Sequence, residues 1–168
     1  EDKALKNFKN TKILRPSIIY GIGDNFFGLF EKISKISPIV PIIGPDVKFQ
    51  PIFNNDVASV VVKLLENSKY KKNIYNLCGP EQFTFYDLIK NFMISLNRKR
   101  ILIKLNPKVM MLPGLILQNF PNPPFTFDQM KLLGADNVSD GNFPELTDLD
   151  IKPTYLGPKM LEISQYYD

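Results

Sequence analysis

Residues 17–23 carry the groups best suited to chemistry in this chain of 168 residues. Ser17 and Tyr20 supply hydroxyl groups, and Gly21 and Gly23 make a polar, glycine-bearing loop. The loop follows an apolar stretch, residues 13–19, which has the composition of a buried strand. Ligands of open α/β sheets bind beyond the carboxyl ends of the strands. The pattern therefore predicts a ligand-binding wall at this strand end.

Several kinds of chemistry are excluded by composition. The chain has no histidine, so it contains neither a Ser-His-Asp nor a Cys-His catalytic group, and no histidine-containing metal site. The acidic residues are scattered, and we expect no metal site. The single cysteine, Cys78, follows an apolar strand and cannot form an internal disulfide. We expect it to be a buried small hydrophobic residue in a reducing compartment rather than a reactive thiol.

The overall composition is that of a soluble globular protein, with 44% hydrophobic and 23% charged residues. The longest apolar stretch, residues 109–112, is far shorter than the ~18 residues that span a bilayer, so we expect no transmembrane helix. The first residues do not resemble a signal peptide. The net charge is +4, and basic clusters at 69–72 and 98–100 adjoin expected turns. They are either solvated loops or contacts with an acidic partner or anionic lipid. No nucleic-acid motif accompanies them, so we expect no nucleic-acid partner.

Hydrophobic periodicity predicts alternating strands and helices. We expect Asp24 or Asn25 to cap a helix ending near Ile36, Asp56 to cap a helix ending at Leu65, and Thr84 to cap a helix ending near Leu96. Further strands are expected at 72–77 and 101–105, short extended segments at 38–44 and 49–53, and a last helix after 158. The expected core consists of Ile13, Leu14, Ile18, Ile19, Val60, Val61, Leu64, Ile74, Leu77, Leu88 and Phe92.

A glycine pattern, Gly21, Gly23 and Gly28, is similar to a dinucleotide-binding fingerprint, but its third glycine is displaced and no βαβ unit precedes it. Two interpretations remain open. The glycines supply left-handed turns, or the loop packs over the far end of a cofactor that other residues hold.

Four segments together resemble the extended and atypical short-chain dehydrogenases, the NAD-dependent epimerase/dehydratase group. They are Ile-Leu-Arg-Pro-Ser-Ile-Ile-Tyr-Gly (13–21), Phe-Gln-Pro-Ile-Phe-Asn-Asn-Asp-Val-Ala (49–58), Ile-Tyr-Asn-Leu-Cys-Gly-Pro-Glu-Gln-Phe-Thr-Phe (74–85) and Leu-Thr-Asp-Leu-Asp-Ile-Lys-Pro-Thr-Tyr-Leu (146–156). In that family the first segment lies after the catalytic Tyr-x-x-x-Lys pair, whereas here it begins at residue 13. The resemblance implies a C-terminal fragment that lacks the phosphate loop and this pair, and is not a complete enzyme.

The implied fold is α/β: the C-terminal portion of a doubly wound Rossmann-like parallel sheet (1–105) with a smaller, mostly helical C-terminal lobe (106–168). The implied cofactor is NADP(H) or NAD(H), bound mainly by residues absent from this chain. Its nicotinamide side would be lined by Pro16, Ser17, Ile18, Ile19, Tyr20 and Gly21.

The combination is most similar to the branch formed by the nucleotide-binding accessory subunits of respiratory complex I and their alphaproteobacterial relatives. That resemblance implies a non-catalytic protein, peripheral to the matrix side of the mitochondrial inner membrane or to the cytoplasmic face of a bacterial one. An apolar helix at 107–118 would meet a complex I subunit or the membrane surface. Two alternatives remain: an active NAD(P)-dependent epimerase, dehydratase or reductase in the cytoplasm, and an interaction domain without nucleotide.

Overall fold

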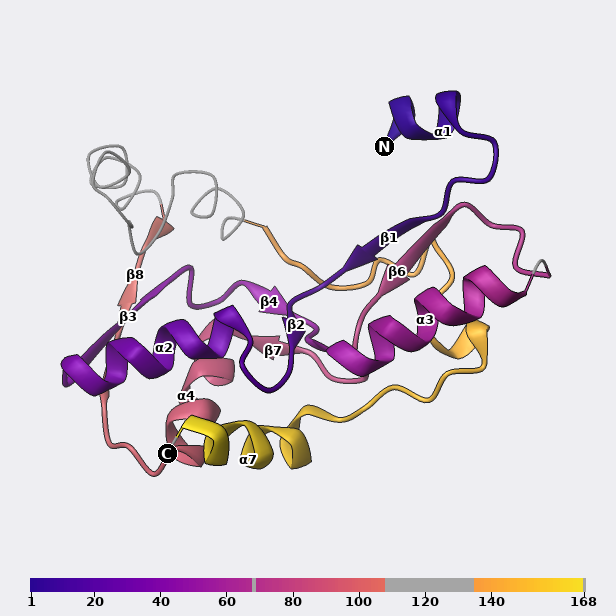
Figure 1. Cartoon of the computed structure of the whole chain (residues 1–168). Helices are drawn as coiled ribbons and strands as arrows, with labels where there is room; N and C mark the ends of the chain where they lie inside the picture. The colour runs from indigo at the N-terminus through magenta and orange to yellow at the C-terminus, as the bar shows by residue number, and fades with distance from the viewer. Residues whose placement is uncertain (68, 108–134, 168) are drawn as a thin grey trace.

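The computed structural model describes residues 1–67, 69–107 and 135–167, and within them helices alternate with short strands (Figure 1). The helices are α1 (Asp2–Asn7), α2 (Asn25–Ile36), α3 (Asn54–Glu66), α4 (Phe85–Ser95) and α7 (Leu156–Tyr167), with a 3₁₀ turn η1 (Thr147–Leu149). The strands are β1 (Ile13–Pro16), β2 (Ile19–Tyr20), β3 (Ile39–Ile43), β4 (Lys48–Phe49), β5 (Ile52–Phe53), β6 (Ile74–Leu77), β7 (Phe83–Thr84) and β8 (Ile101–Leu105).

Three of the four described strand pairs are parallel, as the sequence predicts for an α/β fold. β1 pairs with β6, β2 with β5 and β3 with β8, all in parallel, and β4 pairs antiparallel with β7. The expected strand 13–19 is divided in two after Pro16. Proline has no N–H to donate to a sheet, and the chain leaves the β1–β6 pair at this residue to join β5.

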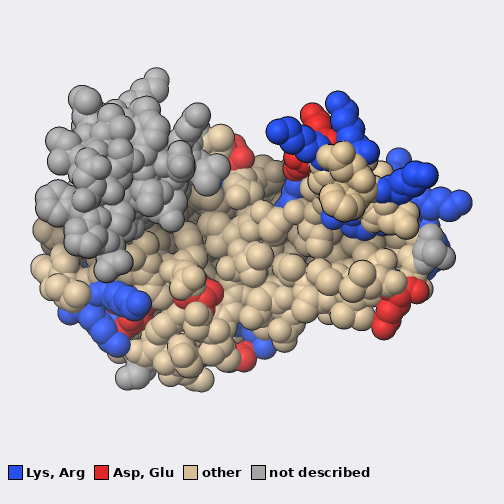
Figure 2. All heavy atoms as spheres, turned by 45° about the horizontal axis from the view of Figure 1, so that its top comes forward, with Lys and Arg blue, Asp and Glu red and all other residues tan. Residues whose placement is uncertain are grey.

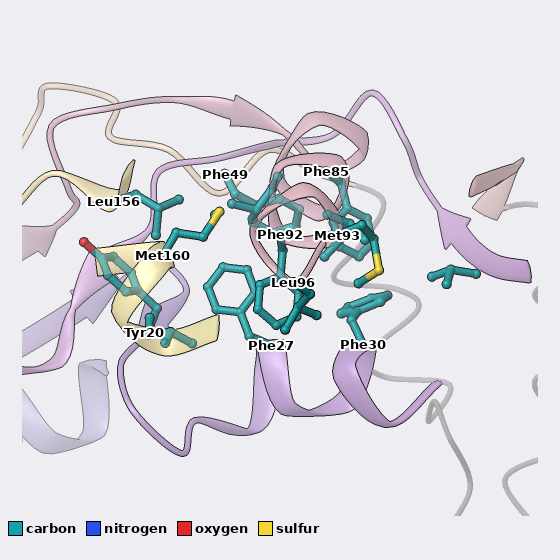
Figure 3. Packing of buried hydrophobic residues seen from close by; sticks show 14 of the residues in the cluster. Tyr20, Phe27, Phe30, Phe49, Phe85, Phe92, Met93, Leu96, Leu156 and Met160 are labelled. Atoms are coloured by element: carbon teal, nitrogen blue, oxygen red, sulfur yellow. The ribbon is translucent and has the colours of Figure 1, made fainter. Parts of the chain in front are cut away.

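The larger core fills the space between α2, α4 and α7 (Figure 3). The rings of Phe27 on α2 and Phe92 on α4 lie with their centroids 4.6 Å apart, and both are fully buried. Met160 on α7 joins the same cluster. Each of the three helices contributes residues three or four positions apart, which lie on one helical face.

A second core lies between α3, β6 and the segment around η1. Val60 of α3 packs with Tyr75 and Leu77 of β6, and with Leu146 and Leu149 from far along the chain. The long-range contacts matter because a two-stranded parallel sheet needs cover on both faces.

The core expected from the sequence is confirmed in part. Val60, Leu77, Leu88 and Phe92 are fully buried. The prediction that Ile19 and Val61 lie in the core is wrong, since these residues are 40% and 39% exposed. The remaining expected core residues are partly buried: Ile13, Leu14, Ile18, Leu64 and Ile74. The exposed positions lie on β2 and α3, where the described residues bring no further layer against them.

Two of the three expected helix caps are confirmed. Asp24 accepts a hydrogen bond from the Phe27 amide at 2.7 Å, and the Thr84 hydroxyl accepts one from the Asp87 amide at 3.1 Å. Asp56 is not a cap, because α3 begins two residues before it, at Asn54. Its carboxylate has another partner, described below.

Most of the apolar helix expected at 107–118 lies outside the described residues. The expected domain boundary at 106 therefore stays a prediction. Within the described ranges, no helix has the length and apolar character to cross a membrane.

Candidate functional site

The hydroxyl of Ser17, at the carboxyl end of β1, is buried and bound by the chain itself. It donates a hydrogen bond to the carbonyl of Asn137 at 2.8 Å and accepts one from the Gln50 amide at 3.2 Å. The Ser17 amide continues the sheet by donating to the Leu77 carbonyl. Ser17 therefore connects the end of β6, the residue Gln50 and the segment at Asn137. Its hydroxyl uses both hydrogen bonds for these contacts within the chain.

The side chain of Gln50 completes this junction. Its amide nitrogen donates to the Gly79 carbonyl at 2.7 Å, and its oxygen accepts from the Ser139 amide at 3.0 Å. The Ser139 hydroxyl in turn donates to the Glu145 carboxylate. Residues 137–139 thus lie against the carboxyl end of β1. The sequence interpretation missed this contact, and the one available signal was the polar Gln50 ahead of a proline.

Tyr20 is completely buried. Its hydroxyl donates to the Thr154 carbonyl at 3.1 Å, and its ring lies 5.6 Å from that of Phe53. Burial, together with the carboxylates of Asp56 and Glu81, raises the pKa of the Tyr20 phenol well above its ordinary value. Tyr20 therefore holds its proton and acts as a structural residue.

The other expected site residues divide between the surface and the interior. Pro16 is exposed and Ile19 is 40% exposed, whereas Ile18 is partly buried. Gly21 is buried, and its amide donates to the Asp24 carboxylate at 3.1 Å. A Cβ at Gly21 would overlap the side chain of Asn54. The surface that this strand end offers to a ligand is thus apolar, made by Pro16 and Ile19.

The glycine pattern has two structural causes. Gly23 has a φ of +75°, which confirms the left-handed turn expected there. Gly28, inside α2, is needed for a different reason, because a Cβ would lie 2.9 Å from the hydroxyl oxygen of Tyr167. That hydroxyl donates to the Asp24 carbonyl at 3.0 Å and so fastens α7 to the start of α2.

Asp56 fastens the C-terminal segment to α3. Its carboxylate accepts hydrogen bonds from the amide and the hydroxyl of Thr154, at 2.7 and 2.9 Å. The Thr154 carbonyl accepts the hydrogen bond from the Tyr20 hydroxyl. Thr154 therefore connects β2 and α3, whose bonded residues lie 134 and 98 positions earlier in the sequence. The capping interpretation of Asp56 was wrong because the true partner lies 98 residues away in the sequence.

Cys78 is 5% exposed, as expected. Burial and the carboxylates of Glu145 and Asp140 raise the pKa of its thiol to about 11. Hydrogen bonds from the Ser17 and Ser139 amides lower the pKa, but by less than burial raises it. A thiol with this pKa stays protonated and is a poor nucleophile. In the described ranges, no cluster of three acidic or cysteine side chains could hold a metal ion.

The second edge of β1 is unpaired among the described strands, and an apolar groove runs beside it. The groove has a volume of about 290 Å³ and is lined by Asn10, Lys12, Leu14, Val61, Leu64 and Leu65. Leu65 is 81% exposed. Parallel sheets are normally covered on both faces and continue at their edges, so this side of the molecule has the character of an interior surface.

No family model matches the chain. A mitochondrial protein of Dictyostelium discoideum, NADH dehydrogenase [ubiquinone] 1 alpha subcomplex subunit 9, is 28% identical over 162 residues, which are 94% of this chain and 45% of that protein. The subunit of the same name from Arabidopsis thaliana is also 28% identical, over 91% of this chain and 41% of its own length. The chain is a homologue of these subunits. It spans less than half the length of either, which agrees with the expected fragment.

Solved structures show the fold of this homologue. The dTDP-glucose 4,6-dehydratase DesIV from Streptomyces venezuelae superposes with a TM-score of 0.64 at 13% identity, over 98% of this chain and 46% of that one. RMD from Pseudomonas aeruginosa superposes with a TM-score of 0.60 at 14% identity, over 92% of this chain and 47% of that one. The Rossmann-like α/β fold expected from the sequence is thereby confirmed.

Proposed function

We propose that the chain is part of an accessory subunit of respiratory complex I that binds NADP(H) or NAD(H) without turning it over. The observation that carries this proposal is the homology to the subunit 9 proteins over more than nine-tenths of the chain. The fold supports it, because structural neighbours were solved with NADPH or NAD bound.

The strand end fits one wall of a nicotinamide site. Pro16 and Ile19 offer apolar surface, while the hydroxyls of Ser17 and Tyr20 are already engaged by the chain. Such a wall makes van der Waals contact with a nicotinamide ring. Of the expected six residues, we therefore propose that Pro16 and Ile19 touch the cofactor, and that Ser17, Ile18, Tyr20 and Gly21 hold them in place.

The remaining affinity must come from residues outside this chain. A pyrophosphate is bound by backbone amides at a helix N-terminus, and the start of α2 is already capped by Asp24. A single apolar wall cannot offset the entropy lost when a dinucleotide is immobilised. We accordingly place the unpaired edge of β1 and its groove against the remaining part of the longer protein.

The partners and location proposed for the whole protein follow from its relatives. The homologues are named as mitochondrial complex I subunits. We propose that this protein likewise binds complex I subunits, at the matrix side of the mitochondrial inner membrane or the cytoplasmic face of a bacterial one.

Isothermal titration with NADPH tests the nucleotide assignment. The full-length protein is expected to bind NADPH, and residues 1–168 alone weakly or not at all. In the full-length protein, Ile19→Lys should weaken binding about tenfold, equivalent to about 1.4 kcal/mol. Ile22→Lys is the matched control, since Ile22 is 53% exposed three residues further on. Micromolar binding by residues 1–168 alone, or equal effects of the two variants, would contradict the assignment.

A second candidate is an active NAD(P)-dependent epimerase, dehydratase or reductase, and the superposition on DesIV favours it. An intact Tyr-x-x-x-Lys pair upstream of Glu1 would support this enzyme, together with conversion of a sugar-nucleotide substrate: net oxidation of NADPH for a reductase, or an epimerised or dehydrated product without net cofactor consumption for the other two. The third candidate, an interaction domain without nucleotide, is supported by the engaged hydroxyls of Ser17 and Tyr20. Absence of NADPH binding by the full-length protein would establish it.

A further inference from the structure

Five isoleucine side chains are exposed at one end of the molecule, where α2, β3, α4 and β8 meet (Figure 1). They are Ile36 (89% exposed), Ile39 (43%), Ile94 (66%), Ile101 (64%) and Ile103 (40%), and we call them the isoleucine patch. Ile39 and Ile101 are partners in the β3–β8 register. Ile94 and Ile101 line the same groove of about 510 Å³. Ile39, Ile101 and Ile94 are therefore neighbours across β3, β8 and α4.

The exposure is unusual for this kind of sheet. Val40 and Ile42, on the inner face of β3, are fully buried. The opposite face of the β3–β8 pair carries Ile39, Ile101 and Ile103, all at least 40% exposed, whereas Ile43 at the other end of the same face is buried. Parallel sheets normally have both faces covered. An aliphatic surface of this kind on a parallel sheet indicates that something other than water covers it.

Basic residues adjoin the patch. Lys90, Arg98, Lys99 and Arg100 line the groove that also contains Ile94 and Ile101. Lys32 and Lys35 precede Ile36 on α2. Figure 2 shows a small group of Lys and Arg side chains on the left, at this end of the molecule, and a larger group on the right, at the other end. The carboxylate among them, Glu31, is buried and paired with Lys35 at 2.7 Å and with Arg98 at 3.2 Å. Among the described residues, no ion pair engages Lys90 or Lys99.

We propose that the isoleucine patch docks on the surface of an anionic bilayer. Aliphatic side chains enter the boundary between headgroups and acyl chains, and the surrounding lysines bind anionic headgroups. A second copy is a poor occupant, because two basic rims would face each other. The proposal rests on the peripheral location proposed above, and it identifies the surface that makes the contact. It also gives a role to Lys99 of the basic cluster 98–100, for which the sequence leaves open either a solvated loop or an anionic contact. Arg98 and Arg100 are bound to Glu31 and Ser34 within the chain.

Vesicle flotation of the full-length protein tests this proposal. We expect binding to phosphatidylcholine vesicles that contain cardiolipin, weaker binding as salt is added, and little binding to phosphatidylcholine alone. Each basic residue near an anionic surface contributes about 1 kcal/mol, which is about fivefold in partitioning. Lys90→Gln with Lys99→Gln should therefore weaken binding to the cardiolipin vesicles about 25-fold. Ile94→Gln with Ile101→Gln should weaken the binding that remains at high salt.

Matched controls remove the same groups elsewhere. Lys9→Gln with Lys71→Gln changes two exposed lysines, and Leu161→Gln changes a side chain that is 59% exposed on α7. Both should keep vesicle binding. No binding to cardiolipin vesicles, or equal losses in the patch and control variants, would overturn the proposal. Self-association abolished by the patch variants would instead indicate a second copy, and binding only to an acidic protein partner would indicate a protein interface. NADPH titration on the same samples keeps the outcome separate from that of the proposed function.

Discussion

Asp56 joins segments that are far apart in the sequence. Its carboxylate is 8% exposed and accepts two hydrogen bonds from Thr154, so Asp56→Ala removes both and leaves two donors unpaired. Hydrogen bonds to a charged group contribute about 1.5–3 kcal/mol each. We expect the free energy of unfolding to fall by about 3 kcal/mol, measured by urea denaturation.

The neighbouring residue provides the control for this prediction. Asn55 is exposed, and its side chain makes no described contact, so Asn55→Ala should change stability by less than about 0.5 kcal/mol. Thr154→Val, which removes only the hydroxyl donor, should fall between the two variants. Equal stabilities for Asp56→Ala and Asn55→Ala would contradict the role assigned to Asp56.

Cys78 gives a prediction about pH. Burial raises its folded pKa from 9.0 to about 11, so between these values the unfolded chain loses a proton that the folded chain keeps. The unfolded state is then favoured, and the contribution of Cys78 to stability decreases as the pH rises from about 9 toward 11. Cys78→Ala should flatten this alkaline decrease. At about pH 8.5, Ellman's reagent should react slowly with the folded protein and rapidly in urea. Fast reaction of the folded protein would show that the thiol is exposed.

At the scale of elements, the turn after β6 passes very close to the segment before β5. A Cβ at Gly79 would overlap the Pro51 carbonyl oxygen, which is backbone and cannot turn away. Gly79→Ala should therefore destabilise the protein by about 1–3 kcal/mol, the usual cost of overpacking. At Gly157, near the start of α7, no atom beyond its chain neighbours and the backbone of its own helix lies within 4 Å of an added Cβ, so Gly157→Ala should change stability by no more than about 0.5 kcal/mol. Thermal unfolding measures both, and equal losses from the two substitutions would refute the proposed close approach.

At the scale of the whole molecule, the groove beside β1 predicts a difference between the fragment and the longer protein. Leu65 is 81% exposed in this chain, so Leu65→Glu should change the stability of residues 1–168 by no more than about 0.5 kcal/mol. If the remaining part of the protein covers the groove, the same substitution should cost the full-length protein about 2 kcal/mol or more. Leu161→Glu serves as the control on α7. Equal effects of Leu65→Glu in the two proteins would show that the groove stays open.

Much of the local structure could be predicted from the sequence, because the forces that set it act over a few residues. Apolar spacing identified α2, α3 and α4, and the caps Asp24 and Thr84 bond to amides three residues away. The break after Pro16 follows from the missing N–H of proline. Motif order was equally informative, since four short segments in sequence predicted a relationship to the complex I accessory subunits, and the relatives found are homologues of that kind.

The tertiary structure alone decided what the polar side chains do. Ser17, Tyr20 and Asp56 have the residue types of a ligand site, yet their partners are Asn137, Thr154 and again Thr154, which lie 98 to 134 residues away. No local pattern encodes such a pairing, because it depends on which distant loop reaches a strand end. The exposure of Ile19 and Val61 has the same origin: burial depends on whether another layer covers a face, and that layer is not encoded in the face itself.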